Sequence, residues 1–299
     1  MVNQIGFKTV SQLIDLCRQH ISEAATGFWS DDVLLCHVND EQLFVAGRIL
    51  QAAPDYFDIT ESYSVVSGTQ EYDLPINFVK ANYCEYADSL DVDSSRIILP
   101  IIHQLKRAYS RSPEANLGYI DSRYYLRRNK IGFVPSPTQS RTVTLHYARR
   151  LSPIHYGTAT AGAATTITFP STPTAGLVSN INDFYNGDCI YIVSGTGAGQ
   201  IRVISDYVGS TRVATVSSAW ATNPSTDSVY SIISEIPPEF HDILPVGGAI
   251  RALAKASQKE TPASLSNLYE TLFNQMIGII DSRQVQEPRY VNSVYTEDA

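Results

Sequence analysis

Apolar residues recur at intervals of three and four positions in the first part of the chain, a pattern typical of helices that bury one face. A first stripe runs from Val10 to Ala24, and Gly27 is expected to end its helix. Ser30 can cap a second helix, whose mostly apolar stripe continues to Pro54. That second stripe consists of Leu35, Val38, Gln42, Leu43, Ala46 and Ile49. Because the connection is short, the two helices are predicted to be antiparallel.

Helical periodicity returns only near the C-terminal end of the chain. One stripe runs from Phe240 to Ala254, and a second consists of Leu265, Leu268, Leu272, Phe273, Met276 and Ile279. We therefore expect residues 1–56 and 236–283 to form one helical bundle, built from both ends of the chain.

The stretch between the helical parts alternates apolar and polar residues, as β-strands with one buried face do. Residues 57–155 are predicted to form a small antiparallel β unit, with a hairpin turn at Ser67-Gly68 and a short helix over Pro100 to Ser110. Over residues 156–235 the composition shifts to Thr, Ser, Gly and Ala with short β-branched runs. That change predicts an inserted all-β sandwich or barrel, so the predicted fold class is α+β.

The last segment, residues 284–299, carries charges and Pro288 among a few isolated apolar residues. It cannot bury a core by itself, so we expect an extended tail. Within it, Tyr290, Val291 and Tyr295 are spaced like anchors that insert into the groove of a partner.

Composition excludes some classes of protein. The 299 residues include 22 Lys and Arg against 30 Asp and Glu, a formal net charge of −8. Tight sequence-specific DNA binding is not expected from this balance, because it depends on cations that neutralise phosphates; passive passage of DNA remains open. No stretch is long and apolar enough to span a bilayer, and the N-terminus lacks the apolar core of a signal peptide. We expect that the protein does not associate with a membrane. We also expect that it assembles in a reducing cytoplasm.

The motifs that could indicate catalysis or ligand binding do not have the residue spacing that those functions require. The run SGTGAGQ, Ser194 to Gln200, has neither dinucleotide-binding nor P-loop spacing and is followed by a strand pattern, which favours a hairpin turn. The six His and four Cys residues form no zinc-binding pattern, and no GxSxG elbow is present. Asp31 and Asp32 are explained as first-turn charges after Ser30. We expect no catalytic residue, no cofactor, no metal and no enzymatic activity.

Lys106, Arg107 and Arg111 form the best local basic cluster and are candidates to line a passage for DNA. A solvated face or a subunit interface is favoured, because nothing in the sequence shows that these cations converge. The 18 tyrosines favour protein interfaces over catalysis.

Separated segments of the chain resemble the head-to-tail adaptor (connector) family of tailed phages. FWSDDVLLCHVNDEQLFVAGRI (28–49) is similar to the family's first helix pair, and GTQEYDLPINFVKANYCEY (68–86) resembles its hairpin with a Leu-Pro segment. IGFVPSPTQSRTVTLHYARRLSPI (131–154) and IPPEFHDILPVGGAIRALAKA (236–256) resemble its closing strands and first returning helix. The order matches as well. The insert, Gly157 to Ile233, departs from the family and looks like β modules of phage tail and decoration proteins.

The resemblance implies a structural virion protein at the head-to-tail junction, or neck. It implies a homo-oligomeric ring, usually a dodecamer, that binds the portal, extends the channel for non-specific passage of genomic DNA and binds a downstream nozzle or tube protein. A C-terminal segment would reach the portal, which makes Tyr290, Val291 and Tyr295 the expected portal-binding residues. Assembly would take place in the host cytoplasm.

Two other classes remain open. One is a tail-associated glycan- or receptor-binding protein that uses the inserted β module, and the other is a muralytic or other hydrolase. Detection of the subunit at the portal rather than at the tail tip would exclude the receptor-binding protein. A zymogram without cell-wall cleavage would exclude the hydrolase.

Overall fold

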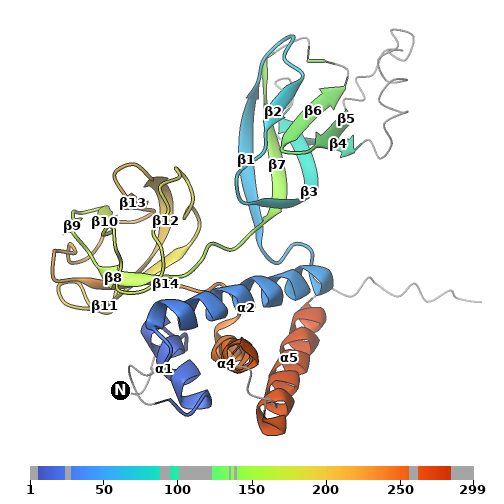
Figure 1. Ribbon diagram of the computed structural model, residues 1–299. Coiled ribbons are helices and arrows are strands. Elements are labelled where there is room, and N and C mark those ends of the chain that lie inside the picture. The colour runs from blue at the N-terminus through green and yellow to red at the C-terminus, as the bar shows by residue number, and fades with distance from the viewer. Residues whose placement is uncertain are drawn as a thin grey trace, which may run out of the picture.

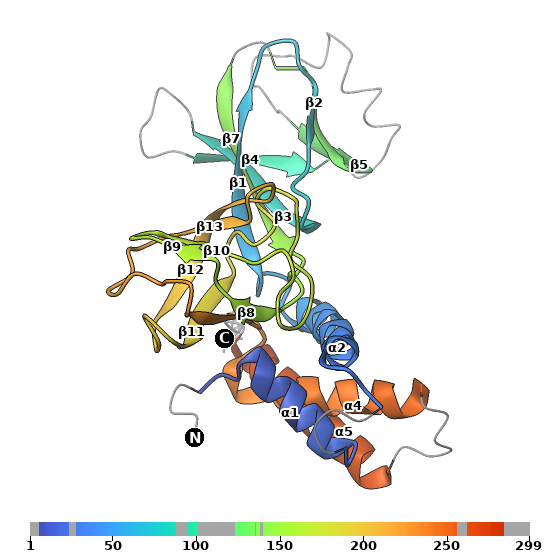
Figure 2. The same cartoon turned by 60° about the vertical axis from the view of Figure 1, so that its left-hand side comes forward.

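The structure is a computed structural model in which helices and two curled sheets occupy separate layers (Figure 1). Both views place the two β units on one side of helix α2 (Asp31–Ala52), opposite helices α4 (Ile243–Lys255) and α5 (Ala263–Arg283) (Figures 1 and 2). The residues described are 6–23, 28–87, 95–100, 123–134, 136–137, 140–255 and 262–283.

Helix α1 (Val10–His20) begins with a capping box, in which the Thr9 side chain accepts from the Gln12 N–H and the Gln12 side chain accepts from the Thr9 N–H. The expected end at Gly27 is wrong, because α1 stops at His20. After it the chain enters the left-handed region at Ser22, with φ 57°, and the Glu23 carboxylate pairs with Arg18. The cap expected at Ser30 is present on α2.

Helix α4 lies beneath α2, between α1 and α5, and contacts all three (Figure 1). Two adjacent glycines permit this position. A Cβ on Gly248 would lie 3.0 Å from Cγ2 of Val38, and one on Gly247 would overlap the side chain of Glu41. The α2–α4 approach therefore depends on glycine at both positions. A short 3-10 helix, Pro238–Phe240, precedes α4.

The first β unit is a seven-stranded sheet of order β1-β7-β3-β4-β5-β6-β2. Its edge strands β1 and β2 are joined by residues 66–70, so the sheet curls around a core of its own. All its pairs are antiparallel except β4–β5, which is parallel. The strands are β1 (Asp58–Val65), β2 (Glu71–Asp73), β3 (Phe78–Ala87), β4 (Ser95–Pro100), β5 (Arg123–Arg127), β6 (Lys130–Val134) and β7 (Arg141–Arg149).

The prediction of a hairpin at Ser67-Gly68 is wrong, because the two strands that flank this turn do not pair with each other. A turn is present there, with Gly68 at φ 82°, but β1 pairs with β7 and β2 pairs with β6. Strand β1 pairs with β7 over eight residues, whereas β2 has only three residues and would allow a much shorter pairing. The short helix expected over residues 100–110 lies outside the described residues, apart from Pro100, which ends β4.

The second β unit is also a seven-stranded sheet, of order β8-β14-β11-β12-β13-β10-β9. Its edge strands β8 and β9 follow each other in the chain, so this sheet also curls on itself. It encloses Phe169, Tyr185, Tyr207 and Tyr230, all buried. The strands are β8 (Tyr156–Thr158), β9 (Ala161–Gly162), β10 (Thr166–Thr168), β11 (Cys189–Ser194), β12 (Ile201–Val208), β13 (Val213–Val216) and β14 (Val229–Ile233).

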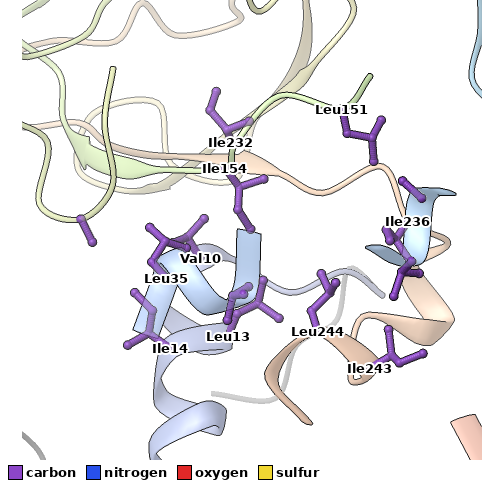
Figure 3. Packing of buried hydrophobic residues seen from close by; sticks show 14 of the residues in the cluster. Val10, Leu13, Ile14, Leu35, Leu151, Ile154, Ile232, Ile236, Ile243 and Leu244 are labelled. Carbon is purple, nitrogen blue, oxygen red and sulfur yellow. The ribbon is translucent and has the colours of Figure 1, made fainter. Parts of the chain in front are cut away.

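One hydrophobic cluster joins the helices to the interior of the second β unit. Figure 3 shows Ile154 and Ile232, at the base of that unit, above Val10 and Leu35 of the helices. The first β unit has a separate cluster. The mixture of helices and largely antiparallel sheets is compatible with the predicted α+β fold class, and the helical bundle built from both chain ends stays a prediction. The predicted division at residues 56, 155 and 235 stays a prediction.

Candidate assembly surfaces

The site residues predicted from the sequence fall in parts of the chain that the structure does not describe. This holds for the basic cluster Lys106, Arg107 and Arg111, and for the anchors Tyr290, Val291 and Tyr295. Their roles therefore stay predictions.

The glycine-rich run at residues 194–200 is the turn of the β11–β12 hairpin, as its spacing indicated. Thr196 donates from its N–H and its hydroxyl to the Asp227 carboxylate, at 3.1 Å each. A Cβ on Gly195 would overlap the backbone of Asp227. The glycines thus allow close approach of a neighbouring turn, and the donors of Thr196 are already used.

Two histidines are buried structural groups. His241 accepts a hydrogen bond from the Lys8 N–H at Nδ1 and donates from Nε2 to the Ile236 carbonyl, which fixes a neutral ring. His155 packs edge-on against Phe169 and contacts the Tyr230 hydroxyl. Burial lowers the pKa of His155 to about 3.

The buried His155 should make the fold less stable in acid. In the unfolded chain the ring gains a proton below about pH 6.5, whereas the folded ring stays neutral until about pH 3. Stability is therefore lost as the pH falls below 6.5, by about 2 kcal/mol between pH 6.5 and 5. Urea unfolding of wild type and His155→Phe at pH 7.5 and 5 measures this difference. An equal loss of stability in both proteins would contradict it.

A buried charge network joins three parts of the chain. Arg149, at the end of β7, lies 2.8 Å from the Asp188 carboxylate and also pairs with Glu235, beyond β14. Ser152 donates to the second oxygen of Asp188. Arg149 and Asp188 are 5% and 3% exposed, so each charge depends on its partner. We call these four residues the junction network.

A second network joins the helices. Glu41 of α2, buried, accepts from Nε of Arg251 in α4 at 2.8 Å and from the hydroxyl of Tyr269 in α5. The sequence pattern did not single out these residues. Two features of the sequence could have indicated this network. Glu41 is a carboxylate next to the apolar stripe of α2, and α4, which packs against α2, contains the adjacent glycines Gly247 and Gly248.

The last helix carries more apolar surface than its neighbours cover. Leu265 and Met276 are buried as expected, but Leu268 and Ile279 of the same predicted stripe are 41% and 46% exposed. Together with the partly buried Leu272, at positions i, i+4 and i+11, they form one line along α5. We call Leu268, Leu272 and Ile279 the α5 stripe.

Helix α2 also presents apolar residues to solvent. Leu43, expected in the buried stripe, is 41% exposed, and the next residue, Phe44, is 43% exposed beside Phe273 of α5. Gln42 takes the buried position and donates to the Ser152 carbonyl at 2.9 Å. An exposed apolar line on α5, with exposed apolar residues on the neighbouring α2, is typical of a surface that another protein covers.

The described residues hold neither a group of metal ligands nor a membrane-spanning helix. Among them, no three His, Cys, Asp or Glu side chains come together as metal ligands would. None of the helices in the described ranges combines the length and the apolar character needed to cross a membrane.

The family model of the SU10 adaptor protein matches residues 8–181, more than half of the chain. The match covers α1, α2, the first β unit and the first strands of the second one. No curated protein sequence matches the chain. Membership implies a structural role in the virion neck and contacts with portal and tail proteins. The chain belongs to this family and is a phage head-to-tail adaptor protein.

Proposed function

We propose that this chain is the subunit of an adaptor ring, of twelve copies, that joins the portal to the tail and extends the DNA channel. The observation that supports the ring is the uncovered apolar surface on α2 and α5. A neighbouring copy can bury the α5 stripe against a different face of itself, and such head-to-tail contacts close into a ring when the rotation fits. Repetition around the ring multiplies a modest interface.

The portal would lie above this ring and a nozzle or tube protein below it. Tyr290, Val291 and Tyr295 bind the portal in this proposal, and Lys106, Arg107 and Arg111 face the channel. The net charge of −8 suits a conduit, because a subunit that is acidic overall does not hold phosphates tightly, even with these three cations facing the channel.

The α5 stripe can be tested by substitution. Leu268→Glu with Ile279→Glu should abolish rings seen by electron microscopy, since two charges would enter an apolar interface. The melting temperature should hold, because both side chains are exposed in the subunit. Asn267→Glu with Asn274→Glu, at two exposed polar positions of α5 outside the stripe, is the matched control. Normal rings from the stripe variant would overturn this interface.

Attachment to DNA-filled heads that lack the adaptor tests the rest of the proposal. The full chain should bind at the portal, and a chain that ends at Ser282 should fold but lose attachment. Wild-type attachment by the shortened chain would contradict the portal-binding role of the tail. Labelled subunit found at the tail tip would support the receptor-binding alternative, and cell-wall cleavage in a zymogram would support a hydrolase.

A further inference from the structure

A cleft of about 540 Å³ lies between the two β units. The first unit contributes residues 59–61 at the start of β1 and residues 75–77, and the second contributes residues 181–183 and 186–187. The cleft is therefore built from segments far apart in the sequence. None of it belongs to the α2 and α5 surfaces assigned to the ring.

The cleft is lined by two carboxylates and by neutral polar side chains that both donate and accept hydrogen bonds. Glu61 and Asp183 face it from opposite β units, and no Lys, Arg or His is among the described residues that line it. Burial, and then the nearby Asp183, raise the pKa of Glu61. Asn186 donates from Nδ2 to Asp183, while its own Oδ1 is buried with no hydrogen-bond partner among the described residues. Arg149 lies beneath Gly187 and already pairs with Asp188 and Glu235.

The remaining walls are apolar and open to solvent. Ile76 is 55% exposed and Ile181 is 41% exposed, on opposite sides of the cleft, and Ile59 lies beside them. Two carboxylates with no cation among the described lining residues, bordered by apolar walls, suit a guanidinium group flanked by apolar residues. The tail contains one such sequence, Pro288-Arg289-Tyr290-Val291.

The end of α5 lies on the side of the helices from which β1 starts. Tyr269 contacts Glu41 and Phe273 contacts Phe44, so α5 runs in the same direction as α2. Both helices therefore end on the side from which the chain enters β1 and its cleft residues (Figure 1). Arg289 follows the end of α5 by six residues, which span about 20 Å when extended.

We propose that the cleft binds the tail of its own subunit before assembly, with Arg289 between Glu61 and Asp183. Tyr290 and Val291 then pack on the isoleucine walls. The tail leaves the cleft when its anchors reach the portal, so this proposal gives the portal-binding segment a second, earlier binding place.

A fluorescent peptide of residues 283–299, added to the chain that ends at Ser282, tests the cleft directly. The peptide should bind, and Glu61→Gln with Asp183→Asn should weaken binding at least about tenfold, because two charge-assisted contacts are lost. Asp55→Asn with Asp206→Asn, two exposed carboxylates outside the cleft, is the matched control and should bind as wild type. An Arg289→Glu peptide should fail with wild type and bind the Glu61→Arg chain.

Equal binding by the cleft variant and its control, or no binding of either peptide, would overturn the proposal. In the full chain, hydrogen exchange at residues 59–61 and 181–187 should be slower than in the shortened chain, at every protein concentration. Protection that appears only at high concentration would place a neighbour's tail in the cleft and overturn the same-subunit assignment. These measurements use the purified subunit, so they stand apart from ring formation and attachment to heads.

Discussion

Replacing Arg149 by methionine should lower the free energy of unfolding by about 3 to 5 kcal/mol. The substitution keeps an unbranched apolar stem but leaves the Asp188 carboxylate, 3% exposed, without its cation. Ser152 remains as a donor, yet one hydroxyl does not neutralise a buried charge. Glu235 loses its partner too, but it is closer to solvent. Urea unfolding at pH 7.5 measures the loss.

The pH dependence of that variant identifies the cause. Without Arg149, burial should raise the pKa of Asp188 further, so the folded state takes up a proton more readily than the unfolded chain. Such a group favours the fold in acid, and the penalty in Arg149→Met should therefore shrink as the pH is lowered from 7.5 to 5.5. Arg150→Met, at the exposed neighbouring position, is the control and should change stability little. A penalty that is the same at both pH values would argue against an unpaired Asp188.

The helices could be predicted because burial of one face leaves a local pattern. Val10, Leu13, Ile14 and Cys17 are all buried, at the spacing that identified the first helix. The end of that helix could not be predicted, because Arg18 also contacts Asp31, at 2.5 Å, and the Trp29 carbonyl. A long-range contact of this kind has no local signature.

The same limit applies to the surfaces. An apolar stripe in the sequence shows that a helix face is apolar, but it does not say which of its residues a neighbouring element covers. Leu268 and Met276 were both expected to be buried, yet Met276 is buried and Leu268 is exposed. Arg149 and Asp188 are 39 positions apart, and nothing in either neighbourhood indicates the pairing. Gly247 could have been recognised as a packing position, since glycine inside a helix is costly without such a reason.

Replacing Glu41 by alanine should lower the free energy of unfolding by about 3 kcal/mol. The change removes the acceptor that Arg251 and Tyr269 share and opens a cavity between three helices. Arg251 keeps some access to water, which limits the loss, whereas the Tyr269 hydroxyl depends on this carboxylate. Asp40→Ala, at the exposed position beside it, should have a small effect.

A substitution at Gly247 can distinguish the specific contact with Glu41 from a general loss of packing, because only the specific contact predicts opposite effects in two backgrounds. In the wild-type chain Gly247→Ala should destabilise by about 1 to 3 kcal/mol, because the new methyl overlaps the Glu41 side chain. In the Glu41→Ala chain that overlap is gone, and the same substitution should stabilise by up to about 1 kcal/mol through helix propensity and partial filling of the cavity. Unfolding of the four proteins in urea gives both values. The same sign in both backgrounds would show that Glu41 and Gly247 do not set the distance between α2 and α4.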